Sequence, residues 1–184
     1  MIRPLEILFI TWFVCERLFT RRSGAGATSK DRCSFLILVP VQAICIGLAI
    51  SIAIHLREYT FPANEIVQRC GLGVFALGFA LRFYSVFYLG RFFTTNVAIA
   101  SDHRVIDTGP YRYIRHPSYT GLLLIYIGFG LALGNWISLL VLIIPIYAAF
   151  LYRIHVEETA LAEALGEPYR NYMKKTKRLI PMVY

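Results

Sequence analysis

Charged residues and paired cysteines are scarce in this chain. Of its 184 residues, 16% are charged and 57% are hydrophobic, and the mean hydropathy is +0.57. This balance lies outside the range of soluble globular domains. It predicts an integral membrane protein, and the length allows one compact domain over residues 1–184.

The cysteines and the net charge argue against three classes of protein: zinc-binding, disulfide-rich and nucleic-acid-binding proteins. The four cysteines have no CxxC spacing and lie mostly within apolar stretches: Cys15, Cys33, Cys45 and Cys70. This pattern indicates neither a zinc site nor a disulfide framework, and we expect no bound metal. The net charge of +8 is distributed between apolar stretches rather than along one soluble face. Lipid headgroups are therefore expected as partners, and nucleic acid is not.

The apolar stretches predict an all-α bundle of five transmembrane helices. They cover residues 4–19, 35–55, 66–89, 119–133 and 136–152. Three of them approach the roughly 20 residues that a spanning helix needs. The last two are separated by Gly134 and Asn135 alone, which predicts a helical hairpin.

The loops predict the orientation of the bundle. Lys and Arg are concentrated after the first, third and fifth stretches, whereas the other loops have balanced charges or none. The positive-inside rule then places the N-terminus outside and the C-terminus in the cytoplasm. Residues 90–118 and the tail from Arg153 are the cytoplasmic segments long enough to build a site.

The tail is expected to form a cytoplasmic amphipathic helix at the membrane interface. Leu161, Leu165 and Tyr169 supply its apolar face. Gly166 and Pro168 should interrupt it. The basic residues 174–178 are expected to face lipid headgroups.

Three glycines of the third stretch, Gly71, Gly73 and Gly78, look superficially like a nucleotide-binding loop. They lack the strand, turn and helix that phosphate binding requires. We expect them instead to allow close packing of transmembrane helices.

The densest polar motif is GPYRYIRHPSYTG, residues 109–121, which runs directly into an apolar stretch. Polar groups at a membrane cost free energy unless they bind something, so this motif is the predicted site. Pro117 disfavours a helical backbone at His116, so the chain should turn there and a helix should begin. Ser118 is expected to cap this helix, and the free N–H groups of the helix start are expected to receive a carboxylate or hydroxyl group of a ligand.

Simpler interpretations of these residues remain open. One alternative is that His116 only caps a helix and that the tyrosines of the motif belong to an interfacial aromatic belt. Another is that Arg153 and Glu157, four residues apart, form a surface ion pair.

Together with EExxLxxxxGxxYxxY at residues 157–172, the polar motif resembles the isoprenylcysteine carboxyl methyltransferase (ICMT) family over about residues 96–181. The chain looks like a short prokaryotic member in a cell membrane, because eukaryotic members have additional N-terminal spans. The resemblance implies a membrane methyltransferase that uses S-adenosylmethionine (SAM) and releases S-adenosylhomocysteine.

The resemblance also implies the residues of the site. Cofactor contacts carried over from the family are His103, Arg104, Val105, Ile106, Tyr111, His116, Pro117, Ser118, Tyr119 and Glu157, with Asn96 as a further candidate. Arg153 matches the position that addresses the substrate carboxylate. The residues agree with this assignment, since tyrosine faces and a carboxylate stabilise a sulfonium cation.

The predicted reaction is methyl transfer to the carboxylate of a lipophilic, isoprenylcysteine-like acceptor, giving a methyl ester. A phospholipid amine N-methyltransferase is the main alternative; it needs a base, for which Glu157 or His116 is available. A nicotinamide-dependent membrane reductase and a non-enzymatic scaffold are the other classes considered.

Overall fold

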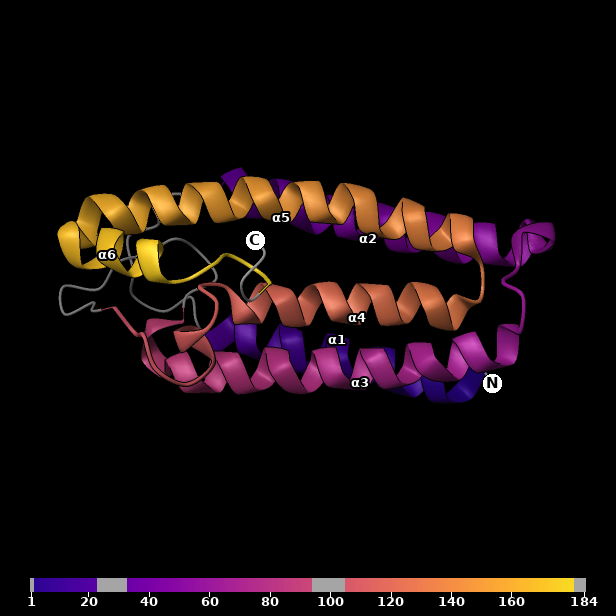
Figure 1. Cartoon of the computed structure of the whole chain (residues 1–184). Coiled ribbons are helices and arrows are strands. Elements are labelled where there is room, and N and C mark those ends of the chain that lie inside the picture. Colours follow the sequence, from indigo (N-terminus) through magenta and orange to yellow (C-terminus); the bar gives the residue numbers. More distant parts are fainter. Residues whose placement is uncertain (1, 23–32, 94–104, 181–184) are drawn as a thin grey trace.

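The computed structural model describes residues 2–22, 33–93 and 105–180, and its regular elements in these ranges are helices (Figure 1). The long helices are α1 (Ile2–Arg22), α2 (Cys33–His55), α3 (Asn64–Leu89), α4 (Pro117–Leu133) and α5 (Trp136–Leu165), followed by the short α6 (Glu167–Lys175). Short 3-10 turns are η1 (Arg57–Tyr59), η2 (Gly90–Phe92) and η3 (Gly109–Arg112). The predicted all-α bundle is confirmed.

Three of these helices, α2, α3 and α5, are long and apolar enough to cross a membrane, counting only the described residues. The apolar α4 is shorter, with 17 residues. In α1 the charged residues Glu6, Glu16 and Arg17 interrupt the apolar sequence. The chain is therefore an integral membrane protein, with α2, α3 and α5 as its clearest spans.

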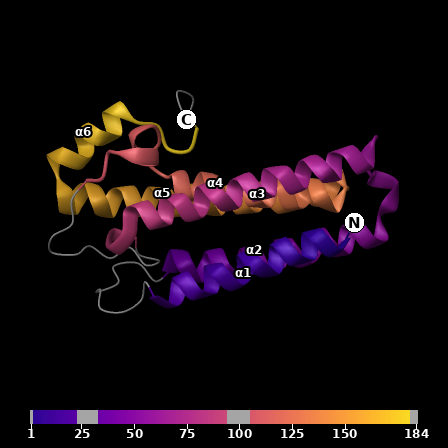
Figure 2. The same ribbon diagram turned by 90° about the horizontal axis from the view of Figure 1, so that it is seen from below.

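The helices form two layers. Figure 2 shows α1 and α2 together on one side of α3, α4 and α5. Aromatic side chains join the layers: the ring of Trp12 in α1 meets Tyr126 edge-on at 5.8 Å, and Phe9 lies 4.9 Å from Phe129. Trp12, Tyr126 and Phe129 belong to one buried core that is shared by both layers.

Glycines bring α3 and α4 into close contact. A Cβ atom added to Gly78 would lie 2.6 Å from the backbone nitrogen of Ile125, and one on Gly71 would lie 2.6 Å from that of Ala132. The expected role in helix packing is confirmed for these two residues. It is wrong for Gly73, where the described residues leave open space around an added Cβ.

The hairpin predicted between α4 and α5 is present. Gly134 adopts a left-handed conformation (φ 76°) and Asn135 caps α5 by accepting a hydrogen bond from the backbone N–H of Ser138 at 3.1 Å. The side-chain amide of Asn135 also donates to the carbonyl of Leu56 at 2.7 Å. This turn and η1 lie together at the end of the bundle opposite α6 (Figure 1).

The α5 helix is longer than a membrane is thick. Its 30 residues rise about 45 Å, against about 30 Å of hydrocarbon, so its last third projects beyond the bilayer. The α5 helix ends at Leu165, and Gly166 (φ 63°) interrupts the helical conformation before α6 begins, as predicted. The α6 helix then folds back toward η3, where the Tyr172 hydroxyl donates to the carbonyl of Tyr111 at 2.6 Å.

Candidate active site

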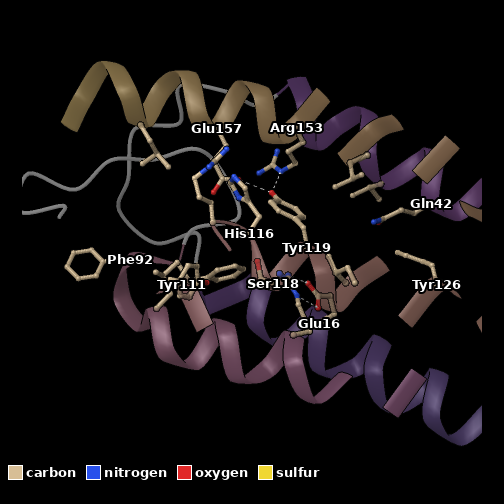
Figure 3. A pocket seen from close by; sticks show the side chains of 18 of the residues that line it. Glu16, Gln42, Phe92, Tyr111, His116, Ser118, Tyr119, Tyr126, Arg153 and Glu157 are labelled. Atoms are coloured by element: carbon tan, nitrogen blue, oxygen red, sulfur yellow. Dashed lines mark hydrogen bonds and ion pairs between the residues drawn. The ribbon is translucent and has the colours of Figure 1, made fainter. Parts of the chain in front are cut away.

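A cavity of about 270 Å³ opens at the α6 end of the bundle and extends between the two layers (Figure 3). Its polar part is lined by Tyr111, His116, Ser118, Tyr119, Arg153 and Glu157. Its apolar part is lined by Phe9, Trp12, Leu38, Ile46, Leu122 and Tyr126. One continuous space therefore joins polar side chains at a membrane surface to an apolar interior.

The hydroxyl group of Tyr119 is the centre of the polar part. The Nε atom of Arg153 donates a hydrogen bond to this oxygen at 3.0 Å, and the hydroxyl donates to Glu157 Oε2 at 3.0 Å. Arg153 and Glu157 lie one turn apart on α5, and both side chains point toward Tyr119, which belongs to α4 (Figure 3). Only 4% of Arg153 is exposed, so this residue does not lie at the surface as the alternative of a surface ion pair requires.

A second cluster of charges holds the polar motif to the tail. Glu158 accepts hydrogen bonds from Arg115 at 2.7 Å and from Arg178 at 3.0 Å, and its Oε1 atom lies 3.3 Å from His116 Nε2. Burial opposes ionisation of Glu158, but the hydrogen bonds from His116 and Arg115 outweigh it and hold its pKa at about 2. Glu158 is therefore a carboxylate at neutral pH.

Backbone contacts tie the same two segments together. The N–H groups of Arg115 and His116 donate to the carbonyls of Lys177 and Arg178 at 2.8 and 3.0 Å. Thr120 donates its hydroxyl to the carbonyl of Leu179 at 2.7 Å. The prediction that residues 174–178 form a lipid-facing patch is wrong for Arg178, whose side chain binds Glu158; Lys177 contributes its backbone carbonyl and keeps an exposed side chain.

Tyrosines close the outer side of the cavity. The hydroxyl of Tyr111 donates to the carbonyl of Ser85 at 3.2 Å, and its ring stacks on that of Tyr88. Burial raises the pKa of Tyr111, Tyr169 and Tyr172 above the usual range for tyrosine. These side chains are therefore neutral and present ring faces rather than charge.

An ion pair lies on the wall of the cavity opposite Arg153 and Glu157. Glu16 of α1 and Arg82 of α3 both line the cavity and are joined through Arg82 Nη2 and Glu16 Oε1 at 2.5 Å and through Nε and Oε2 at 3.3 Å. The guanidinium of Arg82 also lies 5.1 Å from the ring centroid of Phe93. This pair fixes α1 to α3 beside the polar end of the cavity.

Comparison with known proteins identifies the family. The family model described as "Isoprenylcysteine carboxyl methyltransferase (ICMT) family" matches residues 71–163, which contain the polar motif, the hairpin and the first turns of the tail. The chain belongs to the ICMT family.

Curated relatives agree with this membership. A "Probable protein-S-isoprenylcysteine O-methyltransferase" of Oryza sativa subsp. indica is 32% identical over 179 residues, which are 93% of this chain and 88% of the relative. The "Protein-S-isoprenylcysteine O-methyltransferase" of Schizosaccharomyces pombe is 34% identical over 133 residues, which are 70% of this chain but only 56% of the relative. The prediction of a prokaryotic member has no support here, since these ICMT relatives are eukaryotic and the rice protein is of similar length.

A solved structure shares the fold. The chain is similar to the "Structure of the eukaryotic intramembrane Ras methyltransferase ICMT (isoprenylcysteine carboxyl methyltransferase) without a monobody", with a TM-score of 0.66 and 23% identity. The match covers 98% of this chain and 68% of that one. The helical arrangement described above is therefore that of an ICMT membrane enzyme.

Most of the cofactor contacts predicted for an ICMT protein lie around this cavity. Its lining includes Val105, Ile106, Tyr111, His116, Ser118, Tyr119 and Glu157, together with Arg153. Pro117 is the first residue of α4 and is buried. His103, Arg104 and Asn96 lie outside the described residues. The contact of each residue with SAM remains a prediction.

Three local expectations need correction. The N-cap of α4 is His116, not Ser118, which lies inside the helix. The backbone N–H groups of Tyr119 and Thr120 donate to the carbonyl of His116, so they are not free for an anion. His116 does cap the helix through its backbone, but its side chain faces the cavity and Glu158.

The tail also differs from the expected interfacial helix. The tail residues expected to face lipid, Leu161, Leu165 and Tyr169, line the cavity. Leu161 and Leu165 follow Arg153 and Glu157 at intervals of four residues on α5, so they lie on the same face of that helix. Tyr169 lies on α6, which folds back toward η3. Among the described residues, no group of three or more His, Cys, Asp or Glu side chains is placed to hold a metal ion.

Three residues that help to build the site have no role predicted from the sequence. They are Glu158, which holds the polar motif to the tail, and the ion pair of Glu16 and Arg82. A signal was available for the last two, because charges of opposite sign inside apolar helices usually mark a functional position.

Proposed function

We propose that this protein is a SAM-dependent carboxyl O-methyltransferase whose acceptor is a lipophilic, isoprenylcysteine-like acid. The observation that carries the proposal is the cavity of this ICMT family member, which joins the Arg153, Tyr119 and Glu157 cluster to an apolar space between the two layers. An amphiphile with a terminal carboxylate has the matching distribution of polar and apolar atoms.

The chemistry of the polar lining fits SAM. Tyr111 and Tyr169 present neutral ring faces and Glu157 supplies a carboxylate, and both kinds of group stabilise a sulfonium cation. When bound, SAM supplies an activated methyl group. Val105 and Ile106 add apolar contacts on the same side of the cavity. We assign the cofactor to this end, where the tail and η3 close the cavity.

Arg153 is assigned to the acceptor. A carboxylate with a pKa near 4 is ionised at neutral pH, so its methylation requires no general base. The enzyme must instead remove water from the carboxylate and hold it in line for attack. Arg153 is suited to this because it is buried and its orientation is fixed by the hydrogen bond to Tyr119.

The acceptor is proposed to enter sideways from the bilayer, between α1 and α2. Phe13 of α1 and Ala43 of α2 both line the cavity and are exposed, Phe13 by 46%. Exposed apolar side chains at this position face lipid rather than water. The acceptor thus reaches Arg153 without leaving an apolar environment.

The proposed topology is five spans, with the N-terminus outside and the C-terminus in the cytoplasm. Its support is the alternating direction of α1 to α5 and the Lys and Arg asymmetry of the loops. The polar end of the cavity then faces the cytoplasm, from which SAM enters.

The test is methyl transfer by the purified protein from methyl-labelled SAM to N-acetyl-S-farnesylcysteine. The proposal predicts a base-labile methyl ester as product. Label incorporated instead into a base-stable phospholipid amine would support the N-methyltransferase alternative. Binding of NADPH without binding of SAM would contradict methyl transfer altogether.

A further inference from the structure

Four basic residues beside the site take no part in its ion-pair cluster. Among the Lys and Arg residues of segments 109–116 and 172–180, Arg115 and Arg178 bind Glu158. The other four are exposed: Arg112, Lys174, Lys175 and Lys177. Neither segment contains an acidic residue. The contact of Lys174 with Glu167, at 4.0 Å, is weak because both side chains are exposed. The four basic residues therefore give this part of the surface an excess of positive charge.

The two segments are bound to each other, so these cations share one surface. The Nη1 atom of Arg115 donates a hydrogen bond to the carbonyl of Met173 at 3.0 Å. Ile114 and Lys177 form a parallel β-bridge. We call the shared surface the basic surface, and it consists of Arg112, Tyr113, Lys174, Lys175, Lys177 and Ile180.

The basic surface lies where α4 enters the membrane. The carbonyl of Leu179 accepts a hydrogen bond from Thr120, in the first turn of the apolar α4. Ile180 follows this contact and is 53% exposed, and Tyr113 is 65% exposed. Figure 2 shows α6 and the segment after it on the side of α3, α4 and α5 that faces away from α1 and α2. Exposed apolar and aromatic side chains beside cations are typical of the membrane interface, where the cations reach the lipid phosphates.

We propose that the basic surface binds the headgroup of an anionic phospholipid. Anionic lipids attract clusters of Lys and Arg next to a membrane, and zwitterionic lipids have no net charge for this attraction. The exposed Tyr113 and Ile180 favour a lipid over a soluble polyanion, because only a lipid brings acyl chains to these side chains. The acceptor is assigned to the other side of the bundle, between α1 and α2, so this lipid does not occupy its path.

The same lipid should strengthen cofactor binding. Lys177 and Arg178 hold the polar motif through their backbone carbonyls, and Tyr169 and Tyr172 of α6 line the cavity. A lipid that binds the tail only in this docked arrangement stabilises the arrangement. By linkage it raises the affinity of any ligand that needs the same arrangement. This part of the inference rests on the proposed function, because it assigns the cofactor to this end of the cavity.

The first experiment measures headgroup binding. Purified protein in an uncharged detergent is titrated by calorimetry with dihexanoylphosphatidylglycerol and with dihexanoylphosphatidylcholine, which have the same acyl chains. The anionic lipid should bind at least about fivefold more tightly, the factor expected when one Lys or Arg is attracted to an anionic lipid. This preference should disappear at about 1 M salt, where the screening length is about 3 Å.

One combined variant removes the cations of the tail. Lys174→Gln, Lys175→Gln and Lys177→Gln together should abolish the preference for the anionic lipid, while the backbone carbonyl of residue 177 stays in place. The matched control is Arg57→Gln with Arg69→Gln, which removes exposed cations at the opposite end of the bundle. This control should behave as wild type.

The second experiment measures the coupling to the cofactor. The affinity for S-adenosylhomocysteine is determined in nanodiscs of phosphatidylcholine, with and without phosphatidylglycerol. Wild-type protein should bind about fivefold more tightly with the anionic lipid present, the low end of typical coupling between two sites. The triple variant should bind equally in both nanodiscs, with the affinity of wild type in phosphatidylcholine.

The outcomes separate this inference from the proposed function. Equal affinities for the two short-chain lipids, or a preference that the triple variant retains, would overturn the lipid site. Heparin that raises the cofactor affinity in phosphatidylcholine nanodiscs as phosphatidylglycerol does would assign the surface to a soluble partner and overturn it as well. A lipid preference without any change in cofactor affinity would overturn the coupling. Protein that binds neither SAM nor S-adenosylhomocysteine in any nanodisc would contradict the proposed function, and the short-chain lipids would still decide the lipid site.

Discussion

The Nε atom of Arg153 donates a hydrogen bond of 3.0 Å to the phenolic oxygen of Tyr119. This bond joins the point where α5 leaves the membrane to the first turn of α4. The same oxygen donates onward to Glu157, so one hydroxyl group orients the residue assigned to the acceptor and the residue assigned to the cofactor. The account of the site depends on this arrangement.

Tyr119→Phe should therefore lower turnover by about 10- to 100-fold, since hydrogen bonds to charged groups contribute about 1.5–3 kcal/mol each. The ring remains, so the fold should be preserved. Initial rates at saturating SAM, with melting temperature as a check on folding, measure the effect. Tyr113→Phe is the control, because Tyr113 is 65% exposed outside the cavity. Equal rates for the two variants would mean that the hydroxyl has no orienting role.

Gly78→Leu should destabilise the bundle by about 1–3 kcal/mol or more, because the new side chain would meet the α4 backbone. Gly73→Leu places the same side chain on the same helix in open space and should change stability by no more than about 0.5 kcal/mol. Thermal unfolding in detergent compares them. Similar losses in both variants would argue against close packing of α3 on α4.

Glu158→Gln should remove an acid-sensitive contribution to stability. The pKa of Glu158 is about 2 in the folded protein, below its ordinary value of 4.5. A lowered pKa means that the stabilisation is complete above pH 4.5 and is lost as the pH falls toward 2. At neutral pH the variant should lose about 3–5 kcal/mol, the usual cost of removing one partner of a buried pair.

The measurement is the unfolding midpoint of wild type and variant between neutral pH and about pH 3. The difference between them should shrink as the pH falls. Glu163→Gln, an exposed acid on the same helix, should behave as wild type throughout. A difference that stays constant over this pH range would show that Glu158 is not held ionised by its partners.

Single cysteines at Glu58 and Lys175, in a background without the native cysteines, should be labelled from opposite faces of the membrane. Both positions are exposed and lie at opposite ends of the bundle. The positive-inside rule predicts that Lys175 is cytoplasmic. Labelling of both positions from one face would rule out the five-span topology.

Local signals in the sequence predicted the parts of the fold that depend on few residues. Gly134 and Asn135 predicted the hairpin, and Gly166 with Pro168 predicted the break before α6. Each depends on the conformational limits of glycine and proline, which act at the residue itself. The polar motif was recognisable because its composition contrasts with the apolar helix that follows.

Contacts between distant segments were not predictable in this way. Glu16 and Arg82 are separated by 66 positions, and the pairing of two helices leaves no periodic trace in either one. Nothing in the sequence around Glu158 indicates that its side chain contacts Arg115. This contact depends on how α6 folds back over the polar motif, and no local sequence pattern encodes that packing.

The most direct test of the account is the separation of cofactor binding from turnover in two alanine variants. Glu157→Ala should weaken SAM binding in calorimetry, because a carboxylate beside a sulfonium is lost from a partly dry cavity. Arg153→Ala should bind SAM as wild type does but lose about 100-fold or more in turnover, since the acceptor carboxylate is no longer held. Arg153→Lys should recover little turnover, because an ammonium group does not reproduce the guanidinium fork.

Glu163→Ala and Arg170→Ala, exposed residues of α5 and α6, are the controls. This split is the predicted result, and small, equal effects of Glu157→Ala and Arg153→Ala on both binding and turnover would contradict the account.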